Sequence, residues 1–316
     1  MAQSQTPALE IPFSVDYRRR LPFYADVLRR LVREKPLGLL GALLVLMFFT
    51  MAVAAPIIAP YGKDEIGAGP RLGGPTMDNF FGTDNLTRDV FSRVVYGAQV
   101  SMTIGFLAIL LATLISVSIG VISGYFTGWF DMFTQRLVDA FIAFPGLVFI
   151  IAVSSMFLDY EAPGLPTSGV FQTQNVILAL TIGVLLGVGS SRVIRGATLT
   201  VKSQTYIEAS RAIGAGHGRI IFSHVLPNVM APVITLATLG LGTAILLEAS
   251  LSFLGLGVTP DTPTWGGMLN REARTFMSQN VWLAIFPGAA LSLAVFGFNM
   301  LGDALRDLLD PRLRTG

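Results

Sequence analysis

Few side chains in this sequence are suited to catalysis or to metal binding. Its only histidines, His217 and His224, are seven residues apart in a polar segment that separates two apolar stretches. Two imidazoles can share a zinc ion, but such a site needs a third protein ligand, and no carboxylate with matching spacing accompanies them. The chain has no cysteine, which excludes disulfides, thiolate metal sites and cysteine nucleophiles. We therefore interpret both histidines as surface polar residues and predict neither a metal site nor a catalytic residue.

The sequence also lacks the common phosphate-binding motif of ATPases. The phosphate-binding pattern G-x-x-x-x-G-K-[ST] does not occur. If the chain takes part in ATP-driven work, ATP and Mg²⁺ must therefore bind to another subunit, and we expect no cofactor on this chain. An intramembrane hydrolase would need a nucleophile and a base at membrane depth, and both histidines lie outside the apolar stretches.

The elements that must hold these residues are apolar. The chain is 52% hydrophobic and 13% charged, and it contains several apolar runs of about twenty residues, the length of a membrane-spanning helix. The runs do not alternate as the strands of a β-barrel would. We predict an all-α integral membrane protein. Its first run follows 36 polar residues, which favours an uncleaved span over a signal peptide. The six predicted spans cover residues 37–59, 100–124, 136–158, 175–191, 229–249 and 281–302.

The positive charges predict how these spans are oriented. With both termini in the cytoplasm, sixteen of the 22 Lys and Arg residues fall in inner segments and six in outer loops. This N-in/C-in arrangement divides the chain into a six-helix transmembrane domain, 37–302, with cytoplasmic ends at 1–36 and 303–316. Residues 60–99 then form an external loop, and residues 192–228 a cytoplasmic loop.

Glycines recur at intervals of four inside two spans. Gly120, Gly124 and Gly128 share one helix face, as do Gly183 and Gly187. Small residues at this spacing allow neighbouring helix backbones to approach closely. We expect these faces to pack within the chain rather than to form a dimer seam.

The cytoplasmic loop predicts a short helix, a turn and a second helix. Ser203 is a plausible N-cap, Gly214 and Gly216 interrupt the first helix, and Pro227 marks the entry to the next span. A small-residue face of the first helix is suited to docking in the groove of another protein. The alternative is an amphipathic helix that only anchors the loop at the membrane surface. The residues of this face are Ala209, Ser210, Ala212 and Gly214.

Ionisable residues in or near the spans have two interpretations. Arg136 and Asp139 are three residues apart, which favours an ion pair at a helix end. Glu248 ends the fifth span, where an interfacial position is the simpler interpretation. Contact with the amino group of a substrate in the transport pathway is the alternative.

The polar segment resembles the EAA loop of ABC-importer permeases, in which Glu-Ala-Ala is followed by a glycine and then by Ile-x-Leu-Pro. Ser210 replaces the second alanine and His224 the isoleucine, with the spacing unchanged. This resemblance implies a role in ATPase coupling for Glu208, Ala209, Ser210, Gly214, Leu226 and Pro227. Glu208 would hold the loop through polar contacts, Gly214 would permit the turn, and Leu226 and Pro227 would set the angle of the following span.

Further motifs resemble the second permease subunit of the dipeptide/oligopeptide class. They are FGTDNLTRDVFSRVVYGA at 81–98, DAFIAFPGLVF at 139–149, EASLSFLGLGV at 248–258, PTWGGML at 263–269 and NMLGDALRDLLDPR at 299–312. Thr87 stands where that class usually has glycine, and residues 187–196 lack its usual tryptophan. The resemblance covers nearly everything from about residue 37 onward.

The resemblance implies a type I ABC-importer permease fold in the inner membrane of a bacterium. The helix at 205–217 would be a coupling helix seated in a cleft of an ATPase. The implied partners are a second, homologous permease, two cytoplasmic ATPase subunits that bind ATP and Mg²⁺, an extracytoplasmic solute-binding protein and membrane lipid, without nucleic acid. Peptides are the implied substrates. Permeases of similar type carry nickel chelates, glutathione or oligosaccharides.

An ion-coupled secondary transporter is the competing function. Such proteins have interrupted spans and acidic residues near the middle of the membrane. The predicted spans are largely free of central acids, which favours the ATP-driven permease.

Overall fold

The computed structural model describes residues 23–157, 160–166, 169–259 and 262–309, and helices dominate this part of the chain. The parts of the predicted terminal segments at 1–22 and 310–316 lie outside the described residues. In chain order the helices are α1 (Phe23–Glu34), α2 (Pro36–Val53), α3 (Ala55–Ile58), α4 (Val90–Tyr125), α5 (Trp129–Ile142), α6 (Gly146–Met156), α7 (Thr173–Lys202), α8 (Thr205–Ala212), α9 (His217–Ile220), the π-helical turn η1 (Ile221–Val225), α10 (Leu226–Phe253), α11 (Trp265–Met268), the π-helical turn η2 (Leu269–Ala273), α12 (Arg274–Phe276) and α13 (Trp282–Leu309).

Five helices in the described residues are long and apolar enough to cross a membrane. They are α2, α4, α7, the continuous helix from α9 to α10, and α13. The helices α5 and α6 bend by 79° where they meet, and they make a sixth span if they are counted as one. The predicted third span is therefore not a straight helix. The break falls at Pro145, because a proline disfavours the helical conformation in the residue before it.

The predicted lengths of two other spans were wrong. The fourth was expected to be the shortest, but α7 has 30 residues. Its C-terminal half carries arginines, which a hydropathy argument places outside a span. The second span begins at Val90 rather than at residue 100, because Asp89 caps α4 by accepting a hydrogen bond from the Ser92 amide. The loop expected at 60–99 is consequently ten residues shorter.

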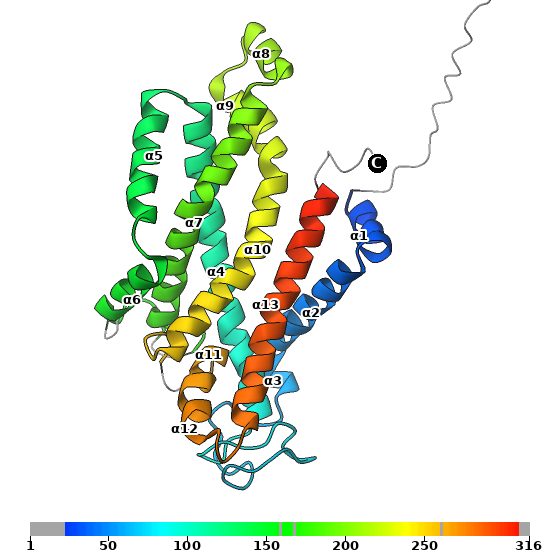
Figure 1. Cartoon of the computed structure of the whole chain (residues 1–316), viewed down its shortest axis with the longest axis vertical. Helices are drawn as coiled ribbons and strands as arrows, with labels where there is room; N and C mark the ends of the chain where they lie inside the picture. Colours follow the sequence, from blue (N-terminus) through cyan, green and yellow to red (C-terminus); the bar gives the residue numbers. More distant parts are fainter. Residues whose placement is uncertain (1–22, 158–159, 167–168, 260–261, 310–316) are drawn as a thin grey trace, which may run out of the picture.

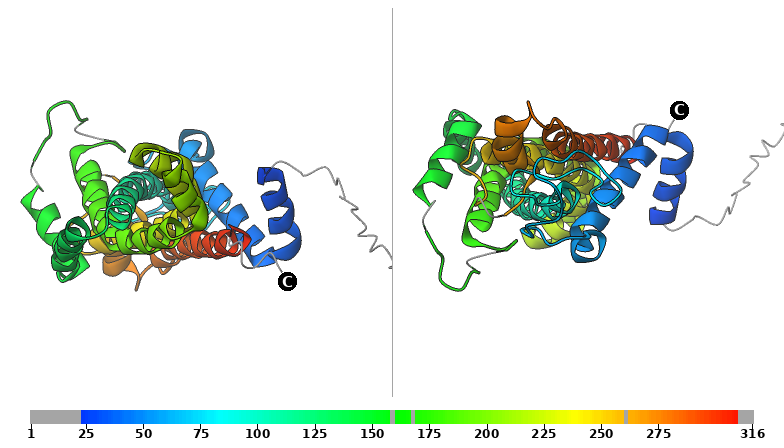
Figure 2. Two further views of the ribbon diagram at one scale, coloured as in Figure 1. Left: turned by 90° about the horizontal axis from the view of Figure 1, so that it is seen from above. Right: turned by 90° about the horizontal axis from the view of Figure 1, so that it is seen from below.

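The long helices lie side by side in one bundle, with different structures at its two ends (Figure 1). α8 projects at one end, called here the α8 end, and the end of α13 lies toward it. The segment 59–89 lies at the other end, called here the loop end, together with α11 and α12. In both end views α5 and α6 stand on one side of the bundle and α1 on the other (Figure 2).

Glycines bring α4 and α7 into backbone contact. A Cβ atom added to Gly120 would lie 2.6 Å from the Ser191 carbonyl oxygen, and one added to Gly187 would lie 2.9 Å from the Ala112 Cα atom. Neither position has room for a side chain. The prediction that these glycines pack within the chain is confirmed for Gly120, Gly124, Gly183 and Gly187, and α4 and α7 form a closely packed pair. It is wrong for Gly128, which follows the end of α4 and where an added Cβ would meet nothing within 4 Å.

A buried ion-pair network joins the segment 59–89 to α4 and η2 at the loop end. The Arg93 guanidinium, in the first turn of α4, is 2% exposed and donates through Nη2 to Glu272 Oε1 at 3.1 Å. Arg88 donates to the same oxygen at 3.0 Å and to Asp84 Oδ2 at 2.6 Å. Because buried charges require partners, this network fixes the segment against the first turn of α4.

Candidate functional site

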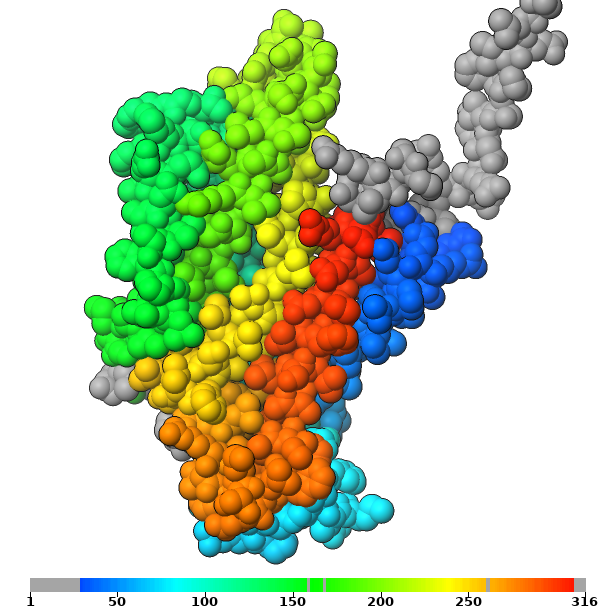
Figure 3. Space-filling model, viewed as in Figure 1, coloured from blue at the N-terminus to red at the C-terminus, as the bar shows by residue number. Residues whose placement is uncertain are grey.

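The segment between α7 and α10 is a helical hairpin at the α8 end. Ser203 does not cap α8 as predicted, because α7 continues to Lys202 and Ser203 is its C-cap. The Ser203 hydroxyl donates back to the Thr200 carbonyl oxygen at 3.0 Å. α8 instead begins after Gln204, without a side-chain cap. In the space-filling view this hairpin protrudes beyond the other helices (Figure 3).

Gly214 ends α8 in the conformation that the glycine pattern predicted. Its φ is +83°, in the left-handed region that side chains with a Cβ disfavour. The Gly214 amide donates to the Arg211 carbonyl oxygen at 2.9 Å, and the Ala215 amide to the Ser210 carbonyl oxygen at 3.1 Å. These two bonds form a Schellman motif, which satisfies the last carbonyls of the helix and reverses the chain.

The chain then continues as one helix from His217 to Phe253. Pro227 was expected to separate a surface helix from the span, but it lies within this helix. The Leu226 amide, in the register of the π-helical turn η1, donates to the Ile221 carbonyl oxygen. A π-turn directly before a proline changes the hydrogen-bonding register where the helix lacks one N–H. Leu226 is half-buried and Pro227 is exposed.

A separate apolar cluster holds α8 on the bundle. Ile207 of α8 is fully buried in it, beside residues from α4, α7, α9 and α10. Burying such a side chain contributes about 1.5–3 kcal/mol. We call this the hairpin cluster, and its buried members are Val121, Tyr125, Ile194, Ile207, Ile220, Val225, Val229 and Val233.

The opposite side of α8 is exposed and carries an apolar patch beside charged side chains. Ala209 and Ala212 lie on it, and Ile213, at the C-cap, is 86% exposed. Glu208 is also exposed and makes no hydrogen bond or ion pair with any residue that the structure describes. The contacts that were expected to hold the loop through Glu208 are therefore not made within this part of the chain. The sequence analysis did not identify Ile213 as part of this surface. An isoleucine directly before the turn glycine of a polar loop could have indicated an exposed apolar side chain.

Ser210 does not belong to the exposed face on which it was predicted to lie. Its side chain is buried, and its hydroxyl lies 3.5 Å from His224 Nε2 on η1. The periodicity of α8 places Ser210 three residues after Ile207, so both point toward the bundle. The predicted small-residue face consists of Ala209 and Ala212, with Gly214 in the turn beyond them.

Both histidines contact residues of the bundle rather than only solvent. His217 Nδ1 is 2.9 Å from the Tyr125 hydroxyl of α4, and His224 faces Ser210. No group of three potential ligands that could hold a metal ion occurs among the described residues. His217 is exposed and His224 half-buried, in agreement with the interpretation as surface polar residues, and each one in addition joins two helices.

Ion pairs attach α5 to α7. Arg195 binds Asp131 through two parallel hydrogen bonds of 2.6 and 2.5 Å. Arg192 pairs with Asp139. The predicted pair between Arg136 and Asp139 does not form, because Asp139 lies two turns after Asp131 on the same face of α5 and points toward α7.

Glu248 lies inside the bundle. It is fully buried, and its carboxylate accepts hydrogen bonds of 2.8 Å from Ser101 on α4 and from Ser252. Glu248 therefore faces the protein interior and not lipid. Its contact with a substrate stays a prediction and would require α4 and α10 to separate.

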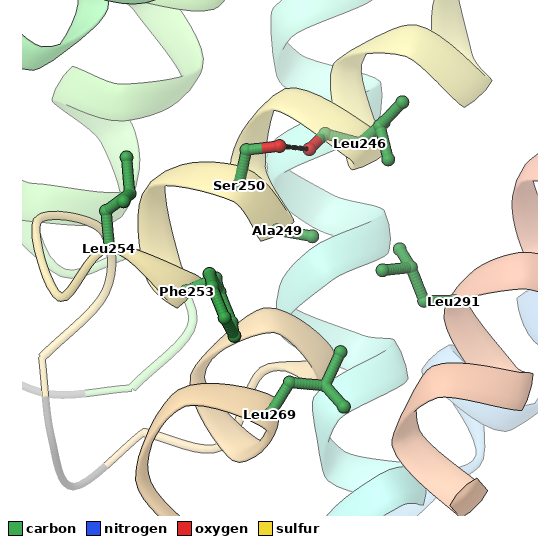
Figure 4. Close-up of a pocket in the computed structure, with 7 residues that line it drawn as sticks. All are labelled: Leu246, Ala249, Ser250, Phe253, Leu254, Leu269 and Leu291. Atoms are coloured by element: carbon green, nitrogen blue, oxygen red, sulfur yellow. Dashed lines mark hydrogen bonds between the residues drawn. The ribbon is translucent and has the colours of Figure 1, made fainter. Parts of the chain in front are cut away.

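An open apolar pocket of about 310 Å³ lies beside α10, and Glu248 is not among the residues that line it. Leu246 and Phe253 of α10 line it together with Leu269 and Leu291 (Figure 4). The Ser250 hydroxyl also lines the pocket, but it donates its hydrogen bond to the Leu246 carbonyl oxygen at 2.7 Å. The pocket therefore offers an almost entirely apolar surface.

Comparison with known proteins places this geometry in a family. Residues 116–315 match the model of the "Binding-protein-dependent transport system inner membrane component" family. The chain is 37% identical over 310 residues to the dipeptide transport system permease protein DppC of Alkalihalophilus pseudofirmus, covering 98% of this chain and 97% of that protein. It is 43% identical over 286 residues to the glutathione transport system permease protein GsiD of Salmonella typhimurium, covering 90% and 89%.

A solved structure shows the same fold. The MetNI methionine ABC transporter, in an inward-facing conformation, matches with a TM-score of 0.53 and 19% identity, over 69% of this chain and 96% of the other. The resemblance drawn from the sequence motifs is thus confirmed for the fold and for the family. The chain belongs to the inner membrane components of binding-protein-dependent transport systems, the permease subunits of ABC importers.

Proposed function

We propose that the hairpin at the α8 end is the site at which a cytoplasmic ATPase drives this permease. The observation that carries the proposal is the two-sided character of α8. Ile207 and Ser210 fix one side to the bundle, while Ala209, Ala212 and Ile213 present an apolar surface to the exterior. An exposed apolar surface on a rigid support is typical of a docking site.

The orientation that fits this role is the one that the charges predicted, with α8 and both termini in the cytoplasm. Glu208, exposed and without a partner in the described part of the chain, would meet a basic or amide side chain of the ATPase. ATP and Mg²⁺ would bind to two such subunits. A second, homologous permease would complete the transport pathway, and a solute-binding protein would deliver substrate at the loop end.

Purification of the tagged chain from the membranes of its native host tests the assignment. We expect an ATPase subunit to co-purify and the complex to hydrolyse ATP. Transport in reconstituted vesicles should then require ATP and resist a protonophore. A purified complex without an ATPase, or uptake abolished by the protonophore alone, would instead support the secondary transporter.

We infer that short peptides are the substrates. The support is that the relatives are named for dipeptide and glutathione transport, and glutathione is itself a tripeptide. We expect unlabelled dipeptides or glutathione to compete with uptake of a labelled dipeptide, whereas a nickel chelate or an oligosaccharide should not. Competition by the oligosaccharide but not by the peptides would reject this substrate class.

A further inference from the structure

Two neighbouring aromatic side chains, Tyr125 and Phe126, pack on His217 of the hairpin, and Tyr125 makes the additional polar contacts. Tyr125 is the last residue of α4 and is 3% exposed. Its hydroxyl lies 2.9 Å from His217 Nδ1 at the start of α9. Its ring meets Arg211 of α8, whose Cζ atom is 5.7 Å from the ring centroid, and Lys202 of α7, whose Nζ atom is 5.9 Å away. Tyr125 therefore contacts α7, α8 and α9 from the end of α4.

These contacts depend on the ring and not on ion pairs. Neither Lys202 nor Arg211 forms a direct salt bridge among the residues that the structure describes; Lys202 donates to the Thr127 hydroxyl at 2.9 Å and interacts with Asp131 only at longer range. Two cations beside one another repel, and the electron-rich faces of the tyrosine ring offset that repulsion. Removing the ring would leave both cations without an aromatic partner and would free the end of α7 from α8.

The helix that ends in Tyr125 spans the molecule. α4 has 36 residues, which corresponds to about 54 Å, and its sequence contains no proline. Arg93, in its first turn, belongs to the buried network that holds the segment 59–89 and η2 at the loop end. A displacement applied to Tyr125 therefore reaches the opposite end of the bundle through one uninterrupted helix.

We propose that Tyr125 is the positioning residue that transmits movement of α8 to α4 and α7, and through α4 to the loop end. This inference rests on the proposed function, in which an ATPase moves α8. The hydroxyl bond to His217 sets the position of α9, and the ring sets the distance between α7 and α8. Docking itself uses the other side of α8, so loss of Tyr125 leaves the docking surface in place.

The test measures ATPase binding and substrate transported per ATP hydrolysed, with the complete complex in proteoliposomes. Tyr125→Leu removes both the ring and the hydroxyl, and we expect the ratio to fall about tenfold with the ATPase still bound. Tyr125→Phe removes only the hydroxyl and should lower the ratio about threefold. Tyr96→Leu, a half-buried tyrosine nearer the other end of α4, is the matched control and should keep the wild-type ratio.

A double-mutant cycle isolates the hydroxyl contact. His217→Ala should lower the ratio at least as much as Tyr125→Phe does, because it also removes the ring contacts of His217 with Tyr125 and Phe126. The combined variant should lose no more than His217→Ala alone. This cycle tests the inference if Tyr125→Leu does not accumulate in the membrane.

A wild-type ratio in Tyr125→Leu, or additive losses in the cycle, would overturn the inference. Release of the ATPase from Tyr125→Leu would also overturn it, because Tyr125 would then stabilise the docking surface and not transmit its movement. Failure of the wild-type chain to bind any ATPase would overturn the proposed function instead.

Discussion

Gly214→Val is expected to abolish transport without preventing insertion of the chain into the membrane. Gly214 has φ of +83° and closes the Schellman turn after α8. The left-handed conformation costs a residue with a Cβ about 1–2 kcal/mol, and a β-branched side chain is the least tolerant of it. Relief of this strain would unwind the turn and move Ile213 away from the exposed face. Uptake by cells and the amount of chain in the membrane fraction are the two measurements.

The matched control is Gly216→Val. Gly216 is two residues away in the same exposed turn, but its φ is −69°, and a Cβ there meets nothing within 4 Å. This variant should transport normally. Gly214→Asn should retain part of the activity, because asparagine tolerates the left-handed region better than valine. Equal uptake by the two valine variants would show that the turn conformation at Gly214 does not matter.

Ile213→Asp is expected to release the ATPase. Ile213 is 86% exposed at the C-cap of α8, so a substitution there removes little packing within the chain. A buried apolar anchor of an interface typically accounts for 2 kcal/mol or more, which corresponds to at least about a 30-fold loss of affinity. An aspartate would also have to lose its hydration on docking. Binding of the purified ATPase to the chain in nanodiscs measures the change.

Ser223→Asp is the control for added charge. Ser223 is exposed on the neighbouring turn η1, and the substitution introduces the same charge without removing an apolar group. Ile213→Leu preserves an apolar side chain and should bind nearly as well as the wild type. If Ile213→Asp binds the ATPase as tightly as Ser223→Asp does, the apolar side of α8 is not the docking surface.

The features of this fold that could be predicted from the sequence depend on residues that are close together along the chain. The turn at Gly214 was predictable because glycine next to a short helix is a direct signal for a positive φ. The packing of Gly120 and Gly187 was predictable because small residues at helical spacing have few other uses in a membrane. Apolar length alone located most of the spans.

Charges inside helices caused most of the errors. Arg192 and Arg195 lie well inside α7, and hydropathy ends the span before them. The helix continues because Asp139 and Asp131 neutralise these two arginines, and no pattern in one segment reveals a partner 50 or more residues away. The burial of Glu248 was hidden for the same reason, since its hydroxyl partner Ser101 is on another helix.

The roles of Tyr125 and Ser210 were equally hidden. Tyr125 ends a long apolar run, and nothing near it in the sequence points to His217, which is 92 residues later. Ser210 occupies a position in a family motif, which suggested a shared surface, but the exposed side of α8 is decided by the packing of Ile207. Contacts between distant segments must therefore come from the three-dimensional structure.

The glycine seam between α4 and α7 limits how this chain can change shape. With backbones in contact at Gly120 and Gly187, the two helices can neither slide past one another nor spread without opening a void. Gly41 of α2 and Gly297 of α13 are similarly close-fitting, since a Cβ on Gly41 would lie 2.7 Å from the Leu301 amide nitrogen. The permease thus has fewer independent moving parts than it has helices. We therefore expect α4 to move together with α7, and α2 together with α13, whenever the permease changes conformation.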